Sequence, residues 1–315
     1  MGGLRKLEAR SWKLEDNKNR ILPRRIFQLP ASSFLLFIVA TLLSCTKDKL
    51  SVEESRATVK LLAGKVQMFG RNDFELNIPE LEVNIYEVTN ASFADFVKKT
   101  GYMTTAEQSG EGMVFDLVKK EWVLTRGADW KHPQGPQSSD SEESMHPVVQ
   151  VSYDDACAYC DWLEMRLPYE SEWEYIYQLD QNNSKEKFNK WDGIFPIEDK
   201  GEDGFTNTAP VGSFKAGRNG IYDLQGNVWE WCIDLYHKNW PQIDTTVMTP
   251  LLQGPTVMSN LWIMNDTLRV IKGGSFLCAE NYCMGYQNEK RQNADPKLSY
   301  EHVGFRCVRD LKKKE

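Results

Sequence analysis

The chain has 315 residues, of which 41% are hydrophobic and 11% aromatic, enough for one large domain with its own core. Its net charge is −7, and because residues 1–44 are net basic, the remainder is more acidic than the total suggests. An acidic domain repels the phosphates of nucleic acids, so the composition argues against a nucleic-acid partner. Ten tryptophans, 21 glycines and 13 prolines favour many turns and short elements over a helical bundle.

The first residues are typical of an export signal. Arg24 and Arg25 precede an apolar run at 34–40, which is too short for a membrane span. Cys45 follows Leu-Leu-Ser and resembles the cysteine of a bacterial lipobox, although Leu43 is not the preferred residue at its position. The alternative is a signal anchor or an ordinary signal with an incidental cysteine.

We therefore expect an exported protein, periplasmic or in the outer membrane, that contacts the membrane only through a lipid on Cys45. Export also permits disulfides. The expected segments are a signal peptide at 1–45, a polar tether at 46–57 and a folded domain at 58–315.

Local patterns predict three helices. Thr89 and Asn90 can cap the first, which Gly101 ends. Ser152 with Asp155 forms a capping box for the second. The third follows Arg166-Leu-Pro and buries a tryptophan at 173. Alternating apolar residues predict strands at 65–69, 81–86, 121–124, 146–152 and 268–271, with a closing strand near 304–308, while 183–255 is expected to be rich in loops.

A pair of cysteines follows the last long predicted strand. Cys278 and Cys283 stand just after Gly273-Gly274, where glycine permits positive φ and a close approach of the backbone. The spacing is not C-x-x-C, and no second pair completes a zinc site. Two thiolates on one short loop can form a disulfide or bind a soft ion such as Cu(I), and the spacing alone does not choose between them.

Three motifs resemble those of the formylglycine-generating enzymes, the sulfatase-modifying factors. They are RLPYESEWEY at 166–175, NGIYDLQGNVWEW at 219–231, and GGS at 273–275 with GFR at 304–306. The resemblance covers residues 63–310 and implies a single α+β domain, C-type lectin-like and poor in regular secondary structure. Because relatives with other activities share these motifs, it is the pair Cys278 and Cys283 that indicates an oxidase.

The family's activity is the copper- and O2-dependent oxidation of a sulfatase cysteine to Cα-formylglycine. The resemblance implies a monomer whose partner is a sulfatase polypeptide carrying a Cys-x-Pro-x-Arg motif. Cys278 and Cys283 would hold Cu(I), with O2 as co-substrate. The remaining site residues implied are Ser275 as catalytic, and Trp130, Tyr282 and Arg291 as substrate-binding.

The resemblance also implies a disulfide and two structural calcium sites. Cys160 and Cys307 fall on positions that are bridged in the family, and Cys157 and Cys232 are then expected to be buried free thiols. Oxygen ligands in these segments suit Ca2+, while Asx-type turns without metal are the alternative. The implied calcium ligands are Asn189, Lys190, Asp203 and Phe205 at the first site, and Asp223, Gly226, Val228 and Glu230 at the second.

The candidate site residues and the function each have an alternative interpretation. Cys278 and Cys283 can form a purely structural disulfide. Tyr282 and Trp130 can be core aromatics, and Arg291 can belong to an ion pair. The sequence departs from the family at Ala294 and His302, where asparagine is expected, and at Asn293, where glutamine is usual. A non-catalytic lipoprotein scaffold of the same fold is the alternative function, but such relatives generally lack the cysteine pair.

Overall fold

The computed structural model describes residues 50–68, 75–138, 144–180, 187–236, 267–287 and 290–311. The expected signal peptide and lipidated Cys45 lie outside these ranges. Within the described residues, the helices are too short or too polar to span a lipid bilayer.

The helices begin and end where the sequence supplies caps. The Thr89 side chain accepts a hydrogen bond from Ser92 N–H, and Gly101 ends the same helix at φ 70°. Ser152 and Asp155 form the predicted capping box. All three predicted helices are therefore confirmed. The helical elements are η1 (Glu54–Arg56), α2 (Asn90–Thr100), α3 (Thr105–Ser109), α4 (Tyr153–Trp162) and α5 (Glu170–Asp180).

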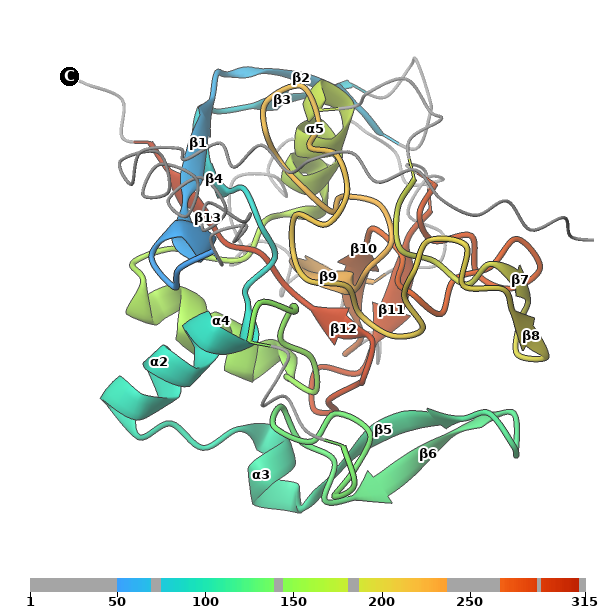
Figure 1. The fold of residues 1–315 in the computed structure, drawn as a ribbon. Coiled ribbons are helices and arrows are strands. Elements are labelled where there is room, and N and C mark those ends of the chain that lie inside the picture. Colours follow the sequence, from blue (N-terminus) through green and yellow to red (C-terminus); the bar gives the residue numbers. More distant parts are fainter. Residues whose placement is uncertain are drawn as a thin grey trace, which may run out of the picture. The chain divides into compact units, whose positions relative to one another are not determined.

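Short strands form several small sheets among these helices (Figure 1). A three-stranded sheet has the order β1-β4-β13, and a four-stranded sheet has the order β11-β10-β9-β12. The remaining strands pair as the hairpins β2–β3, β5–β6 and β7–β8. The bounds are β1 (Thr58–Leu61), β2 (Gly64–Gln67), β3 (Glu75–Ile78), β4 (Leu81–Asn84), β5 (Glu111–Asp116), β6 (Glu121–Arg126), β7 (Gly193–Ile194), β8 (Glu198–Asp199), β9 (Trp229–Leu235), β10 (Arg269–Lys272), β11 (Gln292–Ala294), β12 (Val303–Gly304) and β13 (Val308–Asp310).

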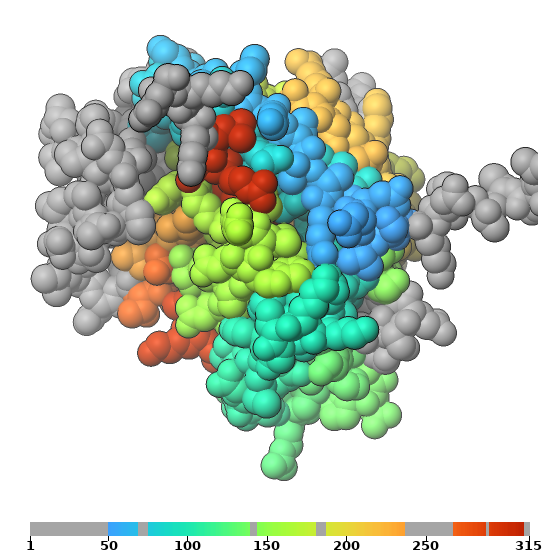
Figure 2. All heavy atoms as spheres, turned by 90° about the vertical axis from the view of Figure 1, so that its left-hand side faces the viewer, coloured from blue at the N-terminus to red at the C-terminus, as the bar shows by residue number. Residues whose placement is uncertain are grey.

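The two ends of the described chain meet in the three-stranded sheet. β1 and β13 both pair antiparallel with β4, and Figure 2 shows the blue and red segments on the same face. The domain also starts earlier than expected. Ser55 is buried with its hydroxyl 2.7 Å from that of Ser92, and Arg56 pairs with Asp95 at 2.8 Å. Residues 50–57 are thus part of the fold rather than of a tether.

Two predicted strands differ from the structure. Residues 146–152 form no regular strand: Val148 N–H bonds to Val88 O, Gln150 N–H bonds to Tyr300 O, and Gln150 has φ 55°. The backbone therefore bonds to separate segments instead of to one partner strand. The closing strand is divided into β12 and β13, which belong to different sheets. β9, inside the region expected to be loops, is a strand that the prediction missed.

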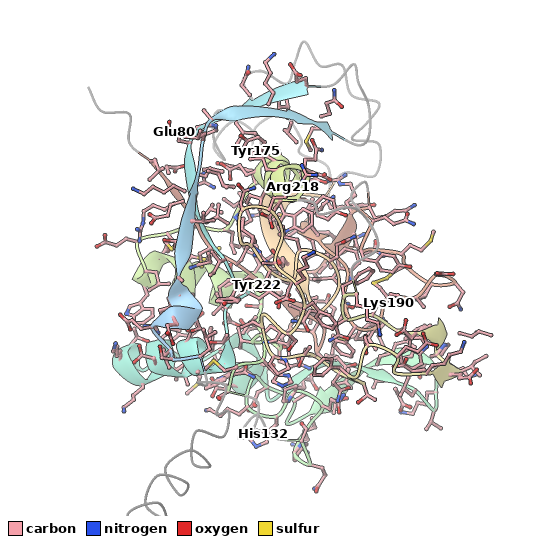
Figure 3. All side chains as sticks on the ribbon, turned by 45° about the horizontal axis from the view of Figure 1, so that its top comes forward. Glu80, His132, Tyr175, Lys190, Arg218 and Tyr222 are labelled. Carbon is pink, nitrogen blue, oxygen red and sulfur yellow. A yellow bond between two sulfur atoms is a disulfide. The ribbon has the colours of Figure 1, made fainter. Side chains whose placement is uncertain are left out.

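The core packs α4 and α5 against the sheets. Phe93 and Tyr159 stack at 5.8 Å between α2 and α4, and Phe305 meets Tyr159 edge-on at 5.4 Å. A second part of the core lies beneath the β2–β3 hairpin, where the Tyr175 hydroxyl of α5 donates to Leu62 O at 2.7 Å (Figure 3). A Cβ at Gly64 would lie 2.3 Å from this hydroxyl, so glycine permits the contact.

Cys160 of α4 and Cys307, just before β13, face each other in this core. Both are buried free thiols in the structure, with their sulfurs 2.8 Å apart. Cys232 is likewise a buried free thiol, whereas Cys157 is only half-buried. The Cys160–Cys307 bridge stays a prediction, but the juxtaposition that it needs is present.

We expect oxidation of this pair to stabilise the domain. The cysteines are 147 positions apart, so closing the loop should add about 5 kcal/mol to the free energy of unfolding on the chain-entropy model. Denaturant unfolding of the wild type should show this difference between oxidising and reducing buffers, and a Cys160→Ala/Cys307→Ala variant should lose most of it. A Cys232→Ala control should keep it. Equal stability of the wild type in both buffers would contradict the bridge.

Candidate active site

The cysteine loop is folded back on itself by the glycines that follow β10. Gly273 and Gly274 both have positive φ, at 96° and 80°. A Cβ on Gly274 would lie 2.5 Å from Tyr286 N, and one on Gly285 would lie 2.2 Å from the Trp229 ring. These contacts exclude larger residues, because real Cβ atoms do not approach so closely. The close approach predicted for the Gly-Gly turn is confirmed.

Cys278 and Cys283 are joined by a disulfide within this loop, with Cα atoms 5.3 Å apart. Cys278 is almost fully buried, whereas Cys283 is half-buried. Ser275 supports Cys278: its backbone N–H points to Cys278 Sγ at 3.4 Å, and its hydroxyl lies 4.0 Å from the same sulfur. The N–H is placed to stabilise negative charge on Cys278 when the disulfide is reduced.

A pocket of about 310 Å³ opens beside the disulfide. It distinguishes this bridge from one sealed inside a core, because both sulfur-bearing residues contribute to the pocket wall. Among the described residues, no Asp, Glu, Lys or Arg lines it. The lining residues are Met113, Trp122, Trp229, Ile271, Ser275, Leu277, Cys278, Tyr282, Cys283, Gln292, Asn293, Ala294, Tyr300, His302 and Val303.

Aromatic contacts fix the rim of this pocket. Tyr282 is half exposed and stacks on Phe195 at 4.3 Å, and Phe195 in turn contacts Phe115 of β5 at 4.8 Å. The Asn281 side chain bonds both the N–H and the C=O of Phe195. The cysteine loop and the hairpins β5–β6 and β7–β8 are therefore held together around the opening.

The structure brings only some of the predicted site residues together. Ser275 and Tyr282 line the pocket with the two cysteines. Trp130 lies outside the lining, 4% exposed in the aromatic core, with its ring 5.4 Å from that of Phe93. Arg291 also lies outside the lining and forms two hydrogen bonds to Glu170, at 2.7 and 2.8 Å.

The Arg291–Glu170 pair nevertheless supports the pocket. It ties the residue before β11 to the first turn of α5, and β11 contributes three consecutive residues to the lining. The Arg291 guanidinium also lies over the Tyr236 ring at 4.7 Å. Glu170 N–H donates to Asp234 at 2.6 Å, and burial beside Glu170 raises the pKa of Asp234 to about 7.

Several residues of the pocket wall were not among the predicted site residues. Trp122 of β6 stacks on His302 at 4.5 Å, and Tyr300 meets His302 edge-on at 6.1 Å. The bridge between Met113 and Tyr300 joins these distant segments. Nothing local in the sequence signals such a pairing, although the departure from the family at His302 marks the region.

The first predicted calcium segment contains a buried side-chain oxygen without a hydrogen-bond partner among the described residues. Asn189 is 1% exposed, its Nδ2 donates to Asn207 O at 2.8 Å and to Asn227 Oδ1 at 3.1 Å, and its Oδ1 has no partner among the described residues. Asp203 accepts from Lys190 N–H and Phe205 N–H, both at 2.9 Å. Burial raises the pKa of Asp203, because a partly desolvated carboxylate is less stable when no cation lies beside it. Lys190 and the β7–β8 hairpin beside it are visible in Figure 3.

The second predicted calcium segment is differently arranged. Arg306 donates to both oxygens of Glu230, at 2.5 and 2.7 Å, and so already provides a positive charge there. Asp223 accepts from Gly212 N–H at 2.8 Å, and burial raises its pKa to about 6. Among the described residues, the buried oxygens of Asp223 and Glu230 are not without hydrogen-bond partners as Asn189 Oδ1 is, so the first segment fits a cation better than the second.

Comparison with known proteins identifies the family. The family model described as "Sulfatase-modifying factor enzyme 1-like domain" matches residues 46–311. The chain belongs to this family. Its single α+β domain with short helices and strands agrees with the fold implied by the sequence motifs.

Members of the sulfatase-modifying factor family differ in activity. The formylglycine-generating enzyme of Thermomonospora curvata is 41% identical over 72% of this chain and 81% of its own length. The chain spans 65% of the mammalian enzymes of that name. The inactive Cα-formylglycine-generating enzyme 2 of Mus musculus is 30% identical over 90% of the chain and 96% of its own length. PvdO from Pseudomonas aeruginosa shares the fold, with TM-score 0.57, 22% identity, and coverage of 81% of this chain and 94% of that one.

Glu301, between two pocket-lining residues, provides a test of the local electrostatics. It is 5% exposed, accepts from Phe115 N–H at 2.6 Å, and burial raises its pKa to about 7. Because the pKa is raised in the folded state, the folded protein binds a proton that the unfolded chain has released between about pH 4.5 and 7. The associated stability is complete below about pH 4 and is lost as the pH rises through 7.

We expect Glu301→Gln to remove this dependence, because the neutral amide keeps an oxygen for Phe115 N–H and cannot ionise. At pH 8 the variant should be more stable than the wild type by at most about 3 kcal/mol. Denaturant unfolding from pH 4 to 8 measures the two curves, with the exposed Glu111→Gln as control. Parallel curves for wild type and Glu301→Gln would show that Glu301 is not held protonated.

Proposed function

We propose that this protein oxidises a cysteine of a sulfatase polypeptide to Cα-formylglycine, with O2 as oxidant and Cu(I) as cofactor. The observation that carries the proposal is a bonded pair, Cys278 and Cys283, in the wall of an open pocket. The relatives named formylglycine-generating enzyme support the reaction. The wall bears Ser275 and Tyr282 but no charged side chain among the described residues.

The proposed reaction needs a thiol reductant in addition to O2 and the substrate cysteine. Conversion of a CH2–SH group to an aldehyde, with release of sulfide, removes two electrons from the cysteine. Reduction of O2 to water takes four, so a thiol reductant must supply two more and become a disulfide. The same reductant can open the Cys278–Cys283 disulfide by thiol exchange.

The reduced pair suits a soft metal. Two thiolates from one loop give the ligand type that Cu(I) prefers, and Ser275 N–H stabilises charge on Cys278. Copper bound there would supply the chemistry with O2. The half-exposed Tyr282 at the rim would contact the incoming polypeptide.

A non-catalytic scaffold is the second candidate. It is favoured by the inactive relative, which matches more of this chain than the active ones do. Trp130 and Arg291, for which the family resemblance implies substrate binding, also lie outside the pocket lining. The two candidates differ in what the purified protein does to a cysteine peptide.

Serine substitution tests the proposal. Cys278→Ser and Cys283→Ser keep the side-chain size but lose the thiolate, so each should abolish Cu(I) binding and bring conversion of a Cys-x-Pro-x-Arg peptide below detection. Mass spectrometry detects the aldehyde in the presence of Cu(I), O2 and a thiol. Cys157→Ser, at a half-buried thiol outside the pocket lining, is the matched control and should retain activity. Conversion by either single pocket variant at the wild-type rate would exclude the dithiolate mechanism, and an inactive wild type would favour the scaffold.

We propose further that the segment holding Asn189 and Asp203 binds a structural Ca2+. Asn189 Oδ1 and the Asp203 carboxylate would provide side-chain oxygens, and Lys190 and Phe205 would provide carbonyls. Excess chelator should lower the melting temperature, because a cation bound only by the folded state stabilises it. Asp203→Asn should remove the chelator effect, whereas Asp192→Asn should not. No change with chelator in the wild type, together with no calcium by elemental analysis, would refute the site.

For the cellular setting, we propose an exported, monomeric, lipid-anchored enzyme whose client is a sulfatase. The lipobox-like sequence at Cys45 supports the anchor and a periplasmic or outer-membrane location. Metabolic labelling with a radioactive fatty acid should mark the wild type and not Cys45→Ser.

A further inference from the structure

His302 has an environment that ordinary core packing does not explain. Its ring lies in the pocket wall, stacked on Trp122 at 4.5 Å with the ring planes 30° apart. Its backbone C=O accepts from Trp229 N–H at 2.9 Å, so both the main chain and the ring are fixed. Its Nδ1 is buried and has no hydrogen-bond partner among the described residues.

An unpartnered ring nitrogen is unfavourable in the free protein. Buried polar groups are nearly always hydrogen-bonded, and exceptions usually mark functional sites. By contrast, the half-buried His146 satisfies its Nδ1 with the Thr208 hydroxyl at 2.9 Å. The missing partner of His302 therefore points to a group that arrives from outside, through the pocket that its ring lines.

The protonation state limits the kind of partner. Burial lowers the pKa of His302 to about 3, so the imidazole is neutral at physiological pH. A ring this weakly basic does not take the proton of a thiol, whose usual pKa is about 8.5. It can, however, accept a hydrogen bond at one nitrogen and donate at the other. A peptide group matches this capacity at both nitrogens, because it is neutral and offers both an N–H and a C=O.

We propose that His302 is a substrate-binding residue, which hydrogen-bonds the peptide backbone of the polypeptide segment that carries the reacting cysteine. This inference rests on the proposed function. The neighbouring amides of Gln292 and Asn293 line the same pocket and are equally neutral, so the wall as a whole suits main-chain recognition. The histidine that stands where the family is expected to have asparagine thus keeps a neutral hydrogen-bonding group at this position.

The test separates binding from chemistry with a peptide that cannot react. A Ser-x-Pro-x-Arg peptide, in which serine replaces the cysteine, is titrated into the wild type and into His302→Phe. Phenylalanine keeps the stacking on Trp122 and fills similar space but has no ring nitrogen. We expect about tenfold weaker binding, the usual effect of one neutral hydrogen bond. The melting temperature should stay unchanged or rise, because a buried unpartnered nitrogen has been removed.

Two further variants control for structural effects. His302→Asn, which restores a neutral amide, should bind within about threefold of the wild type. His146→Phe should show the opposite pattern to His302→Phe, with lower stability from the lost Thr208 bond and unchanged peptide affinity.

The outcomes distinguish this inference from the function on which it rests. Equal peptide affinity of His302→Phe and wild type, in a protein that converts the cysteine peptide, would overturn the role of His302 and leave the function standing. A wild type that neither binds the serine peptide nor converts the cysteine peptide would overturn both.

Discussion

The buried ion pair between Arg306 and Glu230 holds the domain together. Both side chains are almost completely buried, and Arg306 also donates to the carbonyls of Tyr222 and Asn84. Glu230 accepts a further bond from Trp173 Nε1 at 2.8 Å. The pair thereby joins the C-terminal segment, β9, β4 and α5, and removing one partner would leave an uncompensated charge at a cost of about 3–5 kcal/mol.

α5 extends this scheme with acidic residues spaced along its buried surface. Glu170 pairs with Arg291, Glu172 with Arg166, and Glu174 with Lys272. The first two carboxylates also lie in the first turn, where the helix dipole favours negative charge. Because Lys272 ends β10 and Arg291 precedes β11, the ion pairs of α5 fix both strands that flank the cysteine loop.

Local chemistry explains which parts of the fold could be predicted. α2, α4 and α5 follow from caps and apolar spacing within their own sequences, and all three were found. Residues 146–152 alternate like a strand, but their backbone groups bond to Val88 and Tyr300 instead of to one neighbour. β9 was missed because both of its faces are covered: its first four residues are all buried, including the charged Glu230, so buried and exposed positions do not alternate as they do in a half-exposed strand.

The same distinction applies to the site. Ser275, Cys278, Tyr282 and Cys283 lie on one loop, so a local motif is enough to group them. Trp122 and His302 meet only because distant segments pair at Met113 and Tyr300, and a single sequence gives no signal for that contact. Trp130 stands in a motif that resembles the family's cleft wall, yet packing against Phe93 places it in the core.

Alternation along the central strands explains why the pocket is uncharged. Trp229 and Ile271 line the pocket, while the next residues, Glu230 and Lys272, point to the opposite side and form buried ion pairs. Charges that stabilise the fold are thus kept behind the wall. In these uncharged surroundings a bare thiolate is disfavoured, because no cationic side chain lines the pocket beside it, so the polar groups that face the sulfurs have a large effect on them. Ser275 N–H beside Cys278 is such a group, and a soft cation shared by both sulfurs would be a stronger one.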